Sequence, residues 1–123
     1  MKRHIKFEKW ALPKLKQLQK ILLLEDFHPL QIEPSETEAT QSQFHYPYKT
    51  ITIRYSKGLI EYFEEKNYEK CLNIICHEMC HPITDGLYCK AANTFRTRDE
   101  VEDERERLTD HIANIVTKNK LVS

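Results

Sequence analysis

Residues 68–81 read YEKCLNIICHEMCH, and the spacing of their apolar side chains predicts a helix. Leu72, Ile75 and Met79 recur at the i, i+3, i+7 period, and the segment contains neither glycine nor proline. Further isoleucine and cysteine side chains add apolar surface on other sides, so we expect this helix to be buried over most of its surface. Other elements of the chain must therefore pack around it.

Periodic patterns on the N-terminal side of this segment predict a surface helix and a small sheet. Residues 13–24 place leucines at helical spacing between lysines and glutamines, which indicates an N-terminal helix beginning at a proline. Residues 30–32 predict a short strand that is followed by a polar loop. Two runs of period two, at 43–48 and 50–55, predict a hairpin or one long bent strand. A short helix is expected at 59–65.

The C-terminal part of the chain predicts one more helix, over residues 99–119, with glutamates concentrated in its first turns. Its expected apolar face is formed by Val101, Leu108, Ile112 and Ile115. Asn67 is a plausible N-cap for the helix of residues 68–81. Because a residue before proline avoids the helical conformation, Pro82 predicts that this helix stops or kinks at His81.

These elements predict a single α+β domain over residues 1–123, with an N-terminal helix, a small antiparallel sheet, the central helix and a C-terminal glutamate helix. Nineteen basic and nineteen acidic side chains leave no net charge, which argues against binding to nucleic acid or to an anionic membrane surface. The basic N-terminus lacks the apolar region of a signal peptide, and no apolar run could span a bilayer. We therefore expect a cytoplasmic protein.

The pentapeptide His77-Glu78-Met79-Cys80-His81 has the pattern HExxH. On a helix, His77 and His81 lie on one face and can share a metal ion, for which zinc is the expected element. Glu78 could then take a proton from a water molecule activated by the zinc ion. The alternative is a pair of core histidines that are hydrogen-bonded to backbone or carboxylate groups.

A catalytic zinc site needs a third protein ligand and an open position. The glutamates of the last helix normally do no more than interact favourably with the helix dipole. Glu106 is the favoured ligand, because it shares a helix face with Asp110, whose carboxylate could accept the free N–H of a ligating histidine. Glu104, Glu102, His111 and the absence of any third protein ligand remain open alternatives.

Four cysteines, at positions 71, 76, 80 and 89, are expected to be buried structural thiols, because their spacing does not match a paired CxxC metal site. Cys80 lies between the two histidines, and Cys80 or Cys89 could instead complete a closed metal site. A closed site leaves no position for water and supports no hydrolysis. The competing function is thus a non-catalytic zinc-binding domain, or one that only docks a partner protein.

The HExxH motif followed by Glu106-Arg107-Leu108-Thr109-Asp110 resembles the HExxH–ExxxD pattern of the gluzincins, the thermolysin-type zinc metallopeptidases. The resemblance covers roughly residues 49–116, and the compact arrangement is similar to the minimal zincin-like proteins of phages and prophages. It implies that His77, His81 and Glu106 bind zinc, with Glu78 as general base and Asp110 orienting one histidine. The implied activity is hydrolysis of a peptide or protein substrate.

The same resemblance implies a place for the substrate. If residues 50–55 form the sheet edge beside the cleft, an extended peptide could pair with them through backbone hydrogen bonds.

Overall fold

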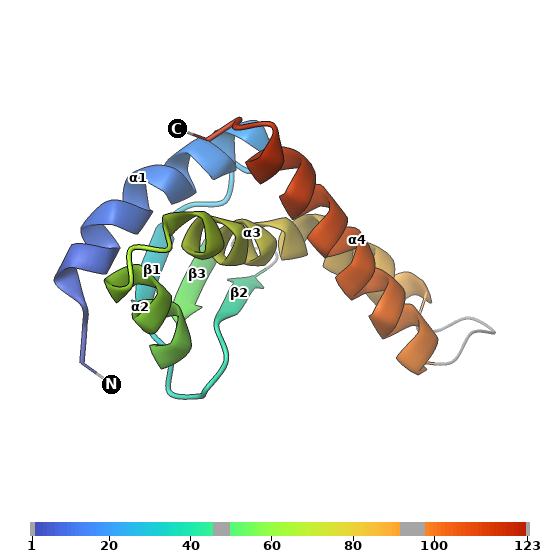
Figure 1. Ribbon diagram of the computed structural model, residues 1–123. Helices are drawn as coiled ribbons and strands as arrows, with labels where there is room; N and C mark the ends of the chain where they lie inside the picture. Colours follow the sequence, from blue (N-terminus) through green and yellow to red (C-terminus); the bar gives the residue numbers. More distant parts are fainter. Residues whose placement is uncertain (1, 46–49, 92–97, 123) are drawn as a thin grey trace.

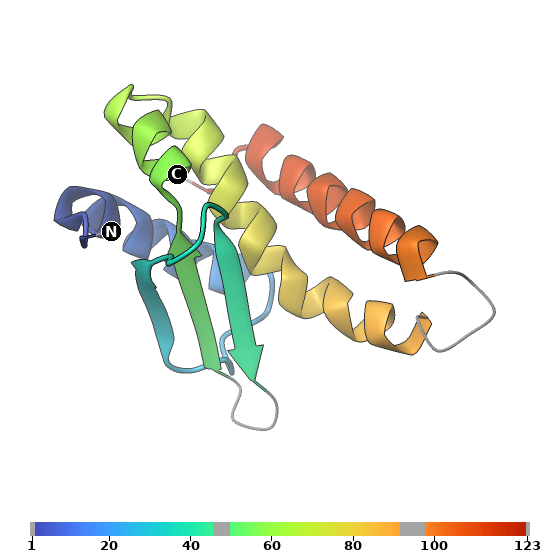
Figure 2. The same ribbon diagram turned by 90° about the horizontal axis from the view of Figure 1, so that it is seen from below.

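Helix α3 (Tyr68–Ala91) lies between the sheet and helix α4 (Arg98–Lys118) in a computed structural model that describes residues 2–45, 50–91 and 98–122 (Figures 1 and 2). Asn67 caps its N-terminus as predicted, since the Asn67 side-chain oxygen accepts a hydrogen bond of 3.3 Å from the Lys70 amide. None of the helices in these described segments carries an apolar stretch long enough to cross a membrane.

Pro82 lies inside α3 and not at its end, so the prediction that the helix stops at His81 is wrong. A proline within a helix costs about 3 kcal/mol, because it removes one hydrogen bond and crowds the preceding turn. Side-chain contacts next to the proline offset this cost. One joins α3 to α4, between the hydroxyls of Thr84 and Thr109 at 2.9 Å, and the other lies within α3, between His81 and Asp85.

The sheet has three strands in the order β1-β3-β2, where β1 is Leu30–Pro34, β2 is Gln41–His45 and β3 is Thr50–Tyr55. Strands β2 and β3 are antiparallel neighbours, which confirms the hairpin. Strand β1 pairs parallel to β3, so the sheet is mixed and the prediction of an antiparallel sheet is wrong. The chain reverses twice between β1 and β3, and this returns β3 to the direction of β1.

The position of β3 also corrects the predicted sheet edge. Strand β3 lies between the other two strands, and the edge nearest α3 is β2 (Figure 2). The side chains of Ile51, Ile53 and Tyr55 are fully buried, because this central strand contributes one whole face to the core. A substrate could therefore pair with β2 but not with β3.

Helix α1 (Ile5–Ile21) covers the sheet together with α3 and begins eight residues before the predicted start at Pro13. Its N-cap is His4, whose ring accepts a hydrogen bond of 3.1 Å from the Phe7 amide. Pro13 is tolerated because it lies on the exposed face, where the carbonyl of Lys9 can bind water in place of the missing amide. A short helix, α2 (Lys57–Glu64), connects β3 to α3.

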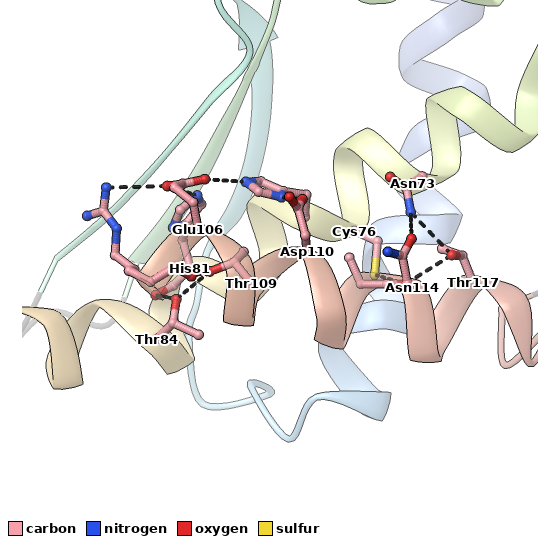
Figure 3. Close-up of polar contacts among 12 residues, drawn as sticks. Asn73, Cys76, His81, Thr84, Glu106, Thr109, Asp110, Asn114 and Thr117 are labelled. Atoms are coloured by element: carbon pink, nitrogen blue, oxygen red, sulfur yellow. Dashed lines mark hydrogen bonds and ion pairs between the residues drawn. The ribbon is translucent and has the colours of Figure 1, made fainter. Parts of the chain in front are cut away.

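Helix α4 buries part of the predicted face, since Val101 is buried and Ile112 packs against the core. Ile115 is instead 47% exposed, and the fully buried residues facing α3 are Thr109 and Ala113. Their small side chains let the two helices approach, and the Thr109 hydroxyl also donates to the Arg105 carbonyl across 2.7 Å. Further along, the Asn73 amide donates to the Asn114 and Thr117 side-chain oxygens (Figure 3). This packing turns the side of α4 that carries Glu106 towards α3, the helix that contains the HExxH motif.

Candidate metal centre

His77 and His81 project from the same face of α3, and the centroids of their rings lie 4.9 Å apart. Their side chains are only 17% and 12% exposed. Together with Glu78 they form a group whose ligand atoms all lie within 4.8 Å of one another. Among the described residues, this is the one group of histidine, cysteine and carboxylate side chains close enough together to hold a metal ion, and it includes neither Glu106 nor Cys80.

A carboxylate holds the Nδ1 atom of each histidine. His77 donates to Asp110 across 2.6 Å, which is the contact expected for Asp110, and His81 donates to Asp85 across 3.0 Å. Because a carboxylate accepts, each Nδ1 is the donor of its hydrogen bond, and Nε2 of a neutral imidazole held in this way carries the lone pair that can bind a metal ion. No role for Asp85 was predicted from the sequence, because Pro82 was expected to stop or kink the helix before that residue. The spacing of four residues between His81 and Asp85 was the pattern that could have indicated it.

Glu106 faces both histidines from α4. Its Oε2 lies 3.1 Å from Nε2 of His77, and its Oε1 lies 3.7 Å from Nε2 of His81. Ligand atoms about 2.1 Å from a tetrahedral zinc ion lie about 3.4 Å from each other, so the separation between Oε2 of Glu106 and Nε2 of His77 suits two ligands of one ion. An Nε2 lone pair opposite a carboxylate oxygen also requires a cation between them, either a proton or a metal ion.

Glu78 occupies a different position from Glu106, although both carboxylates lie near the histidines. Glu78 is buried at the foot of the cleft, and its carboxylate accepts a hydrogen bond from the Ser42 hydroxyl of β2. Burial raises the pKa of the Glu78 carboxyl, while His81, His77 and Ser42 act in the opposite direction. Glu106 is 43% exposed and approaches the Nε2 atoms from the opposite helix.

The other proposed third ligands do not approach the histidines in this way. Glu104 pairs with Arg107 across 2.8 Å and is more than half exposed. Glu102 lines the cleft but contacts Arg105, and His111 is exposed on α4. The arrangement therefore favours Glu106 over Glu104, Glu102 and His111 as a third protein ligand.

The described cysteines lie in the core, as the prediction of structural thiols requires. Cys71, Cys76 and Cys80 are fully buried and free. Cys80 is hydrogen-bonded to Cys76, and this bond, together with burial, raises the pKa of the Cys80 thiol. Cys80 does not belong to the metal-capable group. The side chain of Cys89 lies outside the described part of the chain.

The histidines and Glu78 lie where two hollows meet. The larger has a volume of about 740 Å³ and is walled by β2, α3 and α4. Its walls include Gln41, Ser42, Gln43, Asp85, Glu102, Arg105 and Glu106. The smaller, of about 370 Å³, shares Thr40, His77 and Glu78 with the larger one. Arg105 and Ser42 were not predicted as site residues, because neither belongs to a motif.

Comparisons of the chain with protein-family models, with curated protein sequences and with solved structures find no match. The function therefore has to be inferred from the residues of the site. These residues offer two imidazole nitrogens and nearby carboxylates, a donor set that suits a divalent transition metal ion.

Proposed function

We propose that this protein is a zinc-dependent metallopeptidase. His77, His81 and Glu106 would bind Zn²⁺, and Glu78 would act as general base. The observation that supports this proposal most strongly is the pair of Nε2 atoms facing the two Glu106 oxygens at 3.1 and 3.7 Å, while both Nδ1 atoms are held by carboxylates. Two imidazoles and one glutamate form a well-known donor set of catalytic zinc.

The chemistry follows from the positions of the side chains. A bound Zn²⁺ supplies a Lewis acid that polarises the substrate carbonyl and lowers the pKa of a water molecule. Glu78 accepts one proton from the attacking water as the new C–O bond forms. It then delivers that proton to the amine nitrogen as the C–N bond breaks, so Glu78 ends the cycle as a carboxylate. The Ser42 hydroxyl holds this carboxylate in place throughout.

The cleft supports binding of an extended polypeptide. Gln41, Ser42 and Gln43 of the edge strand β2 line the larger hollow, and an extended chain could add to this edge by backbone hydrogen bonds. Because the smaller hollow lies on the other side of Glu78 and His77, residues on both sides of the scissile bond would find space. This arrangement favours cleavage within a chain.

The charged side chains around the larger hollow also favour internal cleavage. An exopeptidase needs a charged group that is reserved for the terminal amine or carboxylate of its substrate. Here Asp85 pairs with His81 and Arg105, Asp110 pairs with His77, and Arg54 pairs with Glu33 across 2.7 Å. These charged groups are already engaged within the protein.

Peptides with acetylated N-termini and amidated C-termini provide the test. The zinc-loaded protein should cut such blocked peptides at internal bonds, with fragments identified by mass spectrometry. A chelator should abolish the cleavage, and added Zn²⁺ should restore it. Cleavage of only the free-ended versions of the same peptides would contradict the internal mode, and no cleavage of either set would contradict the peptidase function.

A further inference from the structure

We infer that Arg105 is a positioning residue of this metal centre. Its guanidinium holds Glu106 so that Glu106 binds the metal through one oxygen, and it supports His81 through Asp85. The inference rests on the proposed metal site. It assigns a role to a basic side chain that belongs to no part of the HExxH or ExxxD pattern. Its supporting observations are contacts that link α3 with α4.

The guanidinium of Arg105 lies among three carboxylates. Its Nη2 is 3.3 Å from Oε1 of Glu106 and 3.7 Å from Oε1 of Glu102, and its Nη1 is 3.7 Å from Oδ1 of Asp85. The side chain is only 19% exposed and lines the larger hollow. Its one hydrogen bond within this group goes to Glu106, at 3.3 Å, and the two contacts of 3.7 Å are ion pairs that keep the guanidinium on the side of the cleft.

The contacts divide the two oxygens of Glu106 between different partners. Arg105 lies 3.3 Å from Oε1, which is also 3.7 Å from Nε2 of His81, whereas Oε2 lies 3.1 Å from Nε2 of His77. With Oε1 engaged by a cation, Oε2 is the oxygen left for the metal. Binding through one oxygen leaves a coordination position for water, which a catalytic site requires.

The second contact of Arg105 reaches the other ligand helix. Oδ1 of Asp85 is shared between Nδ1 of His81, at 3.0 Å, and Nη1 of Arg105, at 3.7 Å. One side chain on α4 therefore steadies the support of His81 on α3 and the ligand Glu106 on its own helix. Removing it would loosen two of the three ligands together.

A purely electrostatic role would have the opposite effect on zinc affinity. A positive guanidinium near a cation site repels the metal ion, so its removal would tighten zinc binding if charge alone mattered. A positioning role predicts weaker binding, because residues that orient metal ligands typically contribute about 10- to 100-fold to metal affinity or activity. The sign of the change therefore separates the two roles.

The experiment compares the zinc dissociation constants of Arg105→Met, Arg105→Lys and Arg107→Met, measured by competition with a chromophoric chelator. Arg107 is the matched control, because it lies on the same helix, is 72% exposed and pairs with Glu104, which is not a proposed ligand. We expect Arg105→Met to bind zinc about 10- to 100-fold more weakly. Arg105→Lys should recover part of the loss, and Arg107→Met should match the wild type.

The visible spectrum of the cobalt-substituted protein gives a readout that is independent of activity. It should change in Arg105→Met and stay unchanged in Arg107→Met, because only the first alters the arrangement of ligands. If Arg105→Met does not fold, Arg105→Lys carries the test, because one ammonium cannot reach Glu106 and Asp85 as the two guanidinium nitrogens do, and it should bind zinc more weakly than the wild type.

Wild-type zinc affinity, or tighter binding, in a folded Arg105→Met variant would overturn the positioning role while leaving the metal centre intact. If the wild-type protein bound no zinc, the metal centre and the proposed function would fail, and the role of Arg105 would fail with them.

Discussion

Glu78→Gln should lower kcat/KM for peptide hydrolysis by about 10²- to 10⁴-fold, the usual contribution of general acid–base catalysis, and should leave zinc bound. The amide has nearly the shape of the carboxylate and can keep a hydrogen bond with Ser42, but it cannot accept a proton from water. The measurement combines steady-state kinetics on a blocked peptide with metal analysis of the same preparation.

Glu104→Gln is the matched control for this variant. It makes the same chemical change on an exposed side chain of α4 that pairs with Arg107, and it should keep wild-type activity. A Glu78→Gln variant with activity close to the wild type would refute the role of Glu78 as base. Loss of the metal from that variant would instead indicate that Glu78 is a ligand.

Glu106→Ala should weaken zinc binding by more than about 100-fold, beyond the range typical of residues that only orient ligands. The substitution removes the carboxylate that faces Nε2 of His77 at 3.1 Å and Nε2 of His81 at 3.7 Å. Two histidines on one helix then remain as ligands. Chelator competition measures the change, and peptide hydrolysis should be lost at zinc concentrations that saturate the wild type.

Glu102→Ala and Glu104→Ala separate this assignment from its alternatives. Both glutamates lie on the same acidic segment of α4, yet their closest contacts are Arg105 and Arg107. We expect Glu104→Ala to bind zinc like the wild type and Glu102→Ala to differ little from it. If either variant lost zinc while Glu106→Ala retained it, the third ligand would be wrongly assigned.

The helices were largely predictable because their signals are local. The period of residues 68–81 and the cap at Asn67 located α3, and residues 99–119 closely match α4. The direction of β1 was not predictable, because strand pairing depends on contacts distant in sequence. The continuation of α3 through Pro82 depends equally on tertiary packing against α4.

The site residues also fall into those that local spacing predicts and those that depend on contacts distant in sequence. The spacing within α3 brought His77, Glu78 and His81 together, and the four-residue step between Glu106 and Asp110 placed both beside His77. Ser42 reaches Glu78 from a strand more than thirty residues earlier in the chain, and no local pattern marks such a contact. The role of Arg105 was not predictable, because the residue lies in an acidic segment of the sequence, where an arginine usually forms surface ion pairs.

Elemental analysis of the purified protein, with Cys80→Ser measured beside the wild type, tests the metal centre most directly. We predict about one zinc ion per chain in both, because Cys80 is buried and hydrogen-bonded to Cys76, away from the open position that a catalytic site keeps for water. Zinc that is lost with the cysteine would indicate a closed structural site. A wild-type protein without zinc, even after incubation with the ion, would contradict the proposal that HExxH forms a metal centre here.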